Sequence, residues 1–182
     1  YKRQELFDTA IKGIRVQNEL AQESSEIADF WNMLQGFQTS GKCIDRVHYR
    51  IRYMKSFRPL SVREDIEFNE ARPILYLNMA AIASLFNSRN MNATANRSNW
   101  STILSYLKSH PSYLGLKQDR FTILSPSGLP EYSIEIVNGE QVRKVKVNRP
   151  KALCFDYQQL KDTFGLELET EVVSDNTELE GY

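Results

Sequence analysis

The side chains whose types and spacing could do chemistry gather between residues 92 and 151, and the chemistry that they favour is phosphate binding. This stretch holds nine basic residues against four acidic ones, although the chain of 182 residues has a formal net charge of zero. Lysine and arginine side chains neutralise the phosphates of nucleic acids, and a neutral chain with segregated charges can still present a basic face. We therefore expect a nucleic-acid-binding surface in this part of the chain.

One part of that surface is a predicted helix that begins near Trp100. Trp100, Ile103, Leu104 and Leu107 have the i, i+3, i+4, i+7 spacing of one apolar helix face. The opposite face is small and polar, as in a helix that enters a groove of DNA. The residues expected to approach the groove are Arg97, Asn99, Thr102, Ser105 and Lys108.

A predicted β-hairpin supplies the other part. Asn138-Gly139 is a strong hairpin signal between the strand candidates 132–137 and 141–147. A hairpin that follows a groove-binding helix is the pattern of a wing, which can lie along a phosphate backbone. The residues expected to hold phosphates are Lys117, Arg120, Arg143, Lys144 and Lys146. The alternative is that these charges form only a solvated face.

The elements that must position these residues predict an α+β fold. Two amphipathic helices, 2–22 and 27–37, form an N-terminal helical pair interrupted at Ser24 and Ser25. A winged helix-turn-helix-like domain with a β-hairpin wing follows. The predicted division is a helical segment at 1–42, the winged-helix-like domain at 43–165 and an acidic, flexible tail at 166–182.

A further basic strand is expected before the winged-helix elements, at 47–53. Its apolar side chains alternate with His48, Arg50 and Arg52. Such charges either protect a strand edge from pairing or contact phosphates, and both interpretations remain open.

The sequence contains no pattern of residues that indicates a catalytic site or a cofactor site. His48 and His110 are the only histidines, and neither has an identifiable nucleophile or orienting partner. Cys43 and Cys154 stand alone, without the spacing of a zinc site or a disulfide framework. We expect no enzymatic activity, no cofactor, no bound metal and no membrane partner, and we expect a reducing, cytoplasmic setting. The first residues lack an initiating Met, which indicates a piece of a longer protein.

Five segments, taken in order, resemble the C-terminal region of primase and helicase type replication proteins carried by mobile elements of gut bacteria. They are FWNMLQGF, RYMKSFRP, RPILYLN, WSTILSYLKSHPSYLGLKQDRFTI and KALCFDYQQLKDTFGLELE, and the resemblance covers residues 26–170. The most specific part is SYLKSHPSYLGLKQDRF, followed at a distance by FDYQQL. In such proteins an ATPase precedes this region. The resemblance therefore implies an ATPase or helicase partner in the parent chain and an accessory role in DNA binding here, since this sequence contains no Walker motif.

Two functions remain in competition. The leading expectation is a non-catalytic DNA-binding accessory domain, with no preference assigned between single-stranded and duplex DNA. The alternative is a protein docking module of the same replication machinery, because fold alone does not separate the two. A continuous basic face would favour DNA, and a large exposed apolar patch would favour docking.

Overall fold

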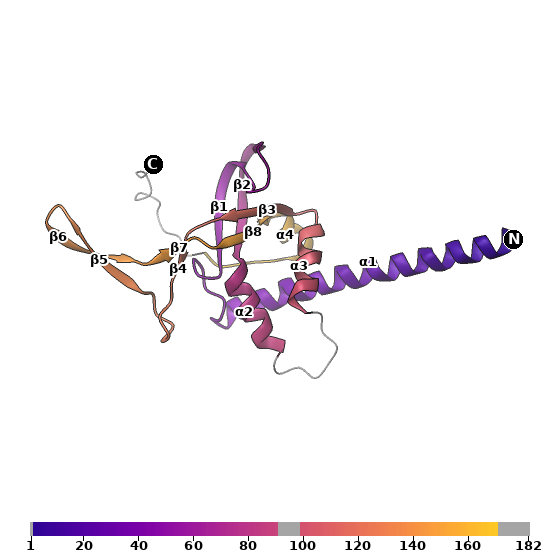
Figure 1. Ribbon diagram of the computed structural model, residues 1–182, viewed down its shortest axis with the longest axis horizontal. Helices are drawn as coiled ribbons and strands as arrows, with labels where there is room; N and C mark the ends of the chain where they lie inside the picture. The colour runs from indigo at the N-terminus through magenta and orange to yellow at the C-terminus, as the bar shows by residue number, and fades with distance from the viewer. Residues whose placement is uncertain (1, 91–98, 171–182) are drawn as a thin grey trace.

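The fold is mixed α+β, and its described residues form four helices and eight strands (Figure 1). The computed structural model describes residues 2–90 and 99–170. In chain order the elements are α1 (Lys2–Thr39), β1 (Tyr49–Phe57), β2 (Ile66–Asn78), α2 (Met79–Asn90), α3 (Trp100–Ser109), β3 (Tyr113–Gln118), β4 (Phe121–Thr122), β5 (Tyr132–Val137), β6 (Glu140–Val145), β7 (Val147–Asn148), β8 (Lys151–Asp156) and α4 (Tyr157–Phe164).

An antiparallel sheet with the strand order β1-β2-β8-β3 forms the centre of the molecule. Side chains alternate between its two faces, as they must on any β-strand. Leu75, Leu77 and Phe155 point into a core shared with all four helices, whereas Tyr76 and Cys154 point into a smaller core on the opposite face. Strand β8 contributes to both cores, and this explains its nearly continuous apolar sequence.

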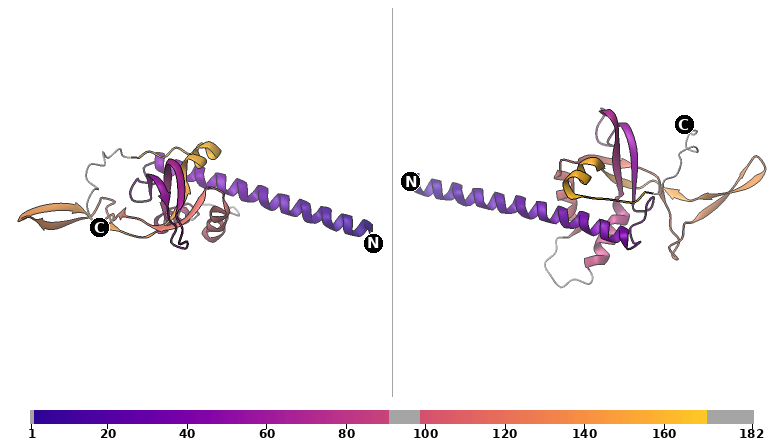
Figure 2. Two further views of the ribbon diagram at one scale, coloured as in Figure 1. Left: turned by 90° about the horizontal axis from the view of Figure 1, so that it is seen from above. Right: turned by 180° about the vertical axis from the view of Figure 1, so that it is seen from behind.

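Helix α1 is a single helix, so the predicted break at Ser24 and Ser25 is wrong. Serine costs only a few tenths of a kcal/mol in a helix, which is too little to stop one whose end is anchored in a core. That anchor includes Phe30 and Trp31, both buried, while the N-terminal half of α1 projects away from the sheet (Figures 1 and 2). None of the helices in the described ranges has the length and apolar character needed to cross a membrane.

The predicted segment boundaries do not separate independent cores. The C-terminal third of α1 lies in the same core as the sheet, and so do Leu166 and Leu168, which follow α4. The predicted acidic tail begins at residue 166, but its residues 171–182 lie outside the described part of the chain.

Residues 66–78 form one continuous strand through Pro73, and residues 113–118, for which no strand was predicted, form β3 at the sheet edge. The pairing of β3 with β8 shifts register between Tyr113 and Gly115. Gly115 has φ +131°, and a Cβ there would lie 2.7 Å from Cβ of Pro59. The bulge therefore requires glycine, both for its backbone angle and for the close approach of Pro59.

Residues 121–148 form an extended arm between β3 and β8. Strands β4 and β7 pair at its root, and β5 and β6 form its two-stranded outer part. Asn138 and Gly139, with φ of 54° and 85°, make the tight turn at its tip, so the hairpin predicted there is confirmed. The arm and the free half of α1 extend from opposite ends of the molecule (Figures 1 and 2).

Gly115 and Gly13 lie in contrasting environments, and substitutions at these two positions test the packing of Pro59 against Gly115. We expect Gly115→Ala to destabilise the fold by about 2 kcal/mol or more, because it combines a disfavoured φ with a clash. Gly13→Ala is the matched control, since Gly13 lies in α1 and a Cβ added there would meet no atom within 4 Å. That change should stabilise the helix by up to about 1 kcal/mol. Urea denaturation of both variants measures the two effects, and equal effects would contradict the close approach of Pro59 to Gly115.

Candidate nucleic-acid interface

A cleft of about 1190 Å³ opens between the arm and the loop that precedes β1. Among the described residues that line it, six are basic and two are acidic. The basic residues are Arg46, Arg50, Arg120, Arg143, Lys144 and Lys146, and the acidic ones are Asp45 and Glu135. An open, positively charged cleft attracts phosphate groups and binds them in a salt-dependent way.

The loop at residues 44–47 forms one wall, and Arg46 joins it to the arm. Arg46 adopts a left-handed φ of 62°, which is uncommon outside glycine. Its backbone N–H donates to the Tyr49 carbonyl at 2.7 Å and to Oδ1 of Asp45 at 2.9 Å. Its carbonyl accepts from the backbone N–H of Thr122, in β4, at 2.8 Å. These bonds compensate the unfavourable backbone angle and fix the distance between the loop and the root of the arm.

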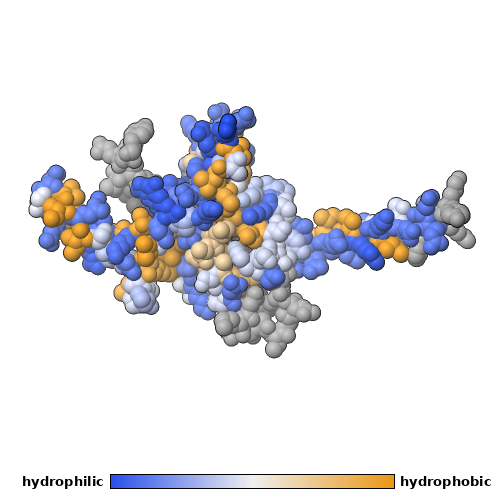
Figure 3. Space-filling view, viewed as in Figure 1, coloured by the Kyte–Doolittle hydropathy of each residue, from blue (hydrophilic) through white to orange (hydrophobic). Residues whose placement is uncertain are grey.

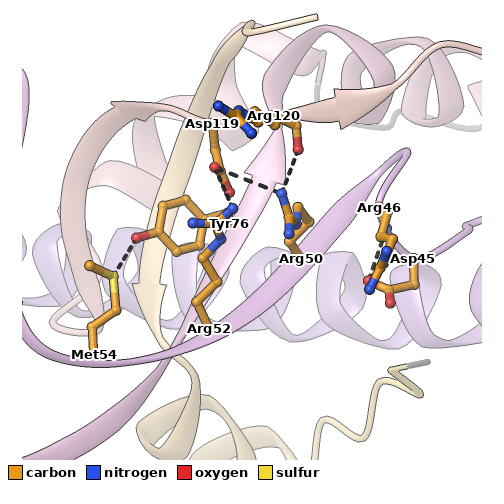
Figure 4. A network of polar contacts seen from close by, with 8 residues as sticks. All are labelled: Asp45, Arg46, Arg50, Arg52, Met54, Tyr76, Asp119 and Arg120. Carbon is orange, nitrogen blue, oxygen red and sulfur yellow. Dashed lines mark hydrogen bonds and ion pairs between the residues drawn. The ribbon is translucent and has the colours of Figure 1, made fainter. Parts of the chain in front are cut away.

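An ion-pair cluster around Asp119 lies beside this wall (Figure 4). Asp119 is buried in the turn before the arm, and its Oδ1 lies 3.1 Å from Nη2 of Arg52 and 4.0 Å from Nη1 of Arg50. Arg50 Nη1 also donates to the carbonyl of Arg120 at 3.0 Å. The cluster holds Arg50 at the cleft and joins β1 to the residue where the arm begins.

The cluster is incompletely satisfied. Neither Oδ2 of Asp119 nor Nε of Arg52 has a hydrogen-bond partner among the described residues, although both atoms are buried. Buried polar atoms normally have partners, and desolvation offsets much of the attraction within a buried ion pair. The cluster is therefore better suited to positioning the arginines than to stabilising the fold.

The cations on the arm wall are also held by neighbours. Lys144 pairs with Glu135 at 2.6 Å and Lys146 with Glu131 at 3.2 Å. Both pairs connect the outgoing and returning segments of the arm. The guanidinium of Arg143 lies 3.8 Å from the centre of the Tyr132 ring. Exposed pairs of this kind contribute little stability, but they restrict where each cation lies.

The structure separates the predicted groove-facing residues from the cleft. Helix α3 lies beside α1, at the end of the body away from the arm (Figure 1). Asn99 is the N-cap of α3, and its Oδ1 accepts from the backbone N–H of Thr102 at 2.9 Å. Ser105 and Lys108 are exposed on α3, but α1 covers the adjoining face through the Phe30–Trp100 ring contact. Residue 97 lies outside the described part of the chain.

Of the predicted phosphate contacts, four line the cleft and one does not. Arg120, Arg143, Lys144 and Lys146 come together there. Lys117 lies instead in a smaller pocket beside Arg58, with its Nζ 5.1 Å from the centre of the Phe57 ring.

Two cleft cations were missing from the predicted phosphate-binding set. The alternating basic pattern of residues 47–53 already marked Arg50 as a possible phosphate contact. Arg46 carries no comparable signal in the sequence, because its place in the cleft depends on a left-handed backbone angle and a bond to β4.

His110 and Ser112 are the nearest approach to a catalytic pair. Nδ1 of His110 lies 2.7 Å from Oγ of Ser112 and accepts from its backbone N–H at 3.2 Å. Both bonds are local and close the turn between α3 and β3. Burial lowers the pKa of His110, although the Glu23 carboxylate opposes this shift. Within residues 2–90 and 99–170, no three His, Cys, Asp or Glu side chains gather as metal ligands would.

The Asp119 cluster predicts a specific loss of stability. We expect Asp119→Asn to lower the free energy of unfolding by about 2 kcal/mol, because it leaves two arginines beside a neutral group. This is less than for a fully buried pair, since the Arg52 side chain is 34% exposed. Asp65→Asn, which breaks the exposed pair with Arg58, is the control and should change stability little. Urea denaturation followed by tryptophan fluorescence would reveal the difference, and equal effects would count against the role assigned to Asp119.

His48 predicts how stability depends on pH. Burial lowers its pKa, and its Nδ1 accepts from the backbone N–H of Ile44 at 3.0 Å, which requires a neutral nitrogen. The unfolded chain therefore binds more protons as the pH falls through about 6.5, so stability is full at neutral pH and decreases below that value.

Melting temperatures between about pH 7.5 and pH 5.5 would measure this decrease. His48→Asn keeps an acceptor for Ile44 but does not titrate, so it should reduce the pH dependence. His110→Asn should remove a separate part of the pH dependence of the melting temperature, because burial also lowers the pKa of His110. If the melting temperature of His48→Asn depends on pH as steeply as that of the unchanged protein, His48 does not contribute to the pH dependence of stability.

Comparisons with protein-family models, with curated proteins and with solved structures give no significant match for this chain. The cleft and its charges are therefore the basis on which a function can be proposed.

Proposed function

We propose that the chain is a non-catalytic DNA-binding accessory domain that holds phosphates in the cleft between the arm and β1. The observation that carries this proposal is the excess of six basic over two acidic residues among the described lining residues. Four of the six come from the predicted phosphate-binding set, and they belong to two separate segments of the chain. Cations from distant segments that face one cleft support an anionic ligand with several charges, as a nucleic acid is.

A winged helix-turn-helix architecture is part of the proposal. The order of β2, α2, α3, β3 and β8 is that of such a domain, with the arm in the position of the wing between its last two strands. Strand β1 and the length of the arm are additions to that plan. In this arrangement the phosphate contacts belong to the arm and the cleft, and the outer face of α3 is secondary.

The biological setting is proposed from the sequence. The resemblance over residues 26–170 supports an accessory role beside the ATPase of a mobile-element replication helicase or primase. Cys43 and Cys154 are both free and buried, which agrees with a reducing compartment such as the cytoplasm.

The outer face of the arm favours a second candidate function, protein docking. Ile134 and Ile136 are 70% and 75% exposed, and they alternate with Ser133 and Glu135, which line the cleft. The space-filling view has apolar surface over this part of the arm (Figure 3). A lone two-stranded ribbon is marginally stable in water, so such a face is suited to covering by another protein. Ser133 and Lys144, which are paired with each other, lie on the other face of the ribbon, whereas Arg143 is paired with Ile134 and shares the apolar face. Docking there would leave Lys144 accessible to DNA.

Fluorescence anisotropy with labelled DNA at two salt concentrations tests the proposal. Arg120→Gln/Lys144→Gln removes two cleft cations from separate segments of the chain and should weaken binding to all sequences. It should also reduce the salt slope by about 0.9 for each phosphate that is no longer neutralised. The control variant Lys12→Gln/Lys55→Gln loses the same charge from exposed residues outside the cleft. It should weaken DNA binding less than the cleft variant does.

Lys108→Gln separates the cleft from the outer face of α3. If this single change weakens binding more than the cleft double variant does, the contact surface is α3 and the cleft proposal is wrong. Failure of the unchanged protein to bind any DNA at low salt would remove DNA binding as a function and leave the docking module.

A further inference from the structure

The part of the cleft lining that carries no charge is unusual for a site that binds single strands. Its described apolar residues include Ile44, Val47, Ile123 and Leu124, and none of the described lining residues is aromatic. Proteins that hold single-stranded nucleic acid use aromatic rings on which successive bases stack. Unpaired bases would therefore find cations for their phosphates in this cleft but no ring to replace the stacking that they need.

The cations of the cleft are also suited to a stiff ligand. Arg50 is held by the Arg120 carbonyl, Lys144 by Glu135 and Lys146 by Glu131, so these cations occupy defined places on two facing walls. Fixed groups bind best to a ligand whose charges are also at fixed spacings, because little conformational freedom is then lost. The backbone of a double helix has such regular phosphates, and its bases are already stacked inside the duplex.

We infer that the cleft binds one sugar–phosphate backbone of a DNA duplex, through its phosphates and without reading its sequence. This inference rests on the proposed DNA-binding function and specifies the form of DNA. The lining holds six cations and two carboxylates, and Asp119 and Glu131 outside it pair with Arg50 and Lys146. The net positive charge at the cleft is therefore smaller than four, and we expect a slope shallower than about −4 in a plot of log K against log salt concentration.

Two residues of β5 with opposite orientations distinguish the cleft face of the arm from its outer face. Ser133 is half-buried and lines the cleft, whereas Ile136 is 75% exposed, and neither it nor its cross-strand partner Gln141 is among the lining residues. A glutamate at either position adds the same charge to the same strand. Only Ser133→Glu would place that charge beside the bound phosphates, where like charges repel.

The test measures anisotropy of a labelled duplex and of each of its separated strands with the unchanged protein. We expect the duplex to bind about tenfold more tightly than either strand, since the strands lose base stacking. Two duplexes of unrelated sequence should bind equally. Ser133→Glu should weaken duplex binding about tenfold and Ile136→Glu less than twofold, with circular dichroism used to establish that both variants fold.

The possible results have different consequences. Single strands that bind as tightly as the duplex would overturn the duplex inference and leave the proposed DNA-binding function standing. Absence of binding to every form at low salt would overturn both. If Ser133→Glu and Ile136→Glu have the same effect on duplex binding, the backbone does not lie in the cleft and the inference is wrong. A strong preference between the two unrelated duplexes would overturn the claim that sequence is not read.

Discussion

The antiparallel pairing of β3 with β8 is the interaction on which the arm and the cleft depend. The arm is the chain between these two strands, and the pairing continues from Gln118 and Lys151 in the sheet to Phe121 and Asn148 at the root of the arm. Strand β8 is buried on both faces, so the sheet that holds the ends of the arm is anchored in two cores. Without the sheet, the short pair of β4 and β7 could not fix the direction of the arm, because a lone hairpin is only marginally stable in water. The hydrophobic effect in the sheet is thus what places the basic residues of the arm opposite those of β1.

The charged contacts around the cleft combine two opposing effects. Pairing with Glu135 and Glu131 lowers the net positive charge on the arm and so lowers the attraction for phosphate. The same pairing restricts the lysine side chains, and this reduces the conformational entropy that binding would otherwise cost. Asp119 acts similarly on Arg50 and Arg52 from below the cleft. A site built in this way is suited to salt-sensitive binding of moderate strength, in which the geometry of the phosphates matters.

The separation of α3 from the arm changes how the basic residues of this chain are interpreted. Helix α3 has the apolar stripe and capped N-terminus that the sequence indicates, and Ile103 and Leu107 are buried as that stripe requires. However, α1 packs against it, and Phe30 of α1 contacts Trp100 of α3 and Phe86 of α2 in one aromatic group. The cations of the arm lie at the other end of the sheet (Figure 1). Within residues 2–90 and 99–170 these are two separate polar surfaces, and of the two it is the cleft that gathers cations from distant segments.

The sequence by itself determined the local features of this protein. The α+β class, helix α3 and the Asn138-Gly139 turn follow from hydrophobic periodicity, capping residues and turn chemistry, all of which act between near neighbours. The basic character of residues 143–146 was also visible there. Only the tertiary structure decided that α1 continues through Ser24, that residues 113–118 form an edge strand and that Arg46 and Lys144 line one cleft. Each of these depends on contacts between residues far apart in the chain, and burial in a shared core can override a weak local preference.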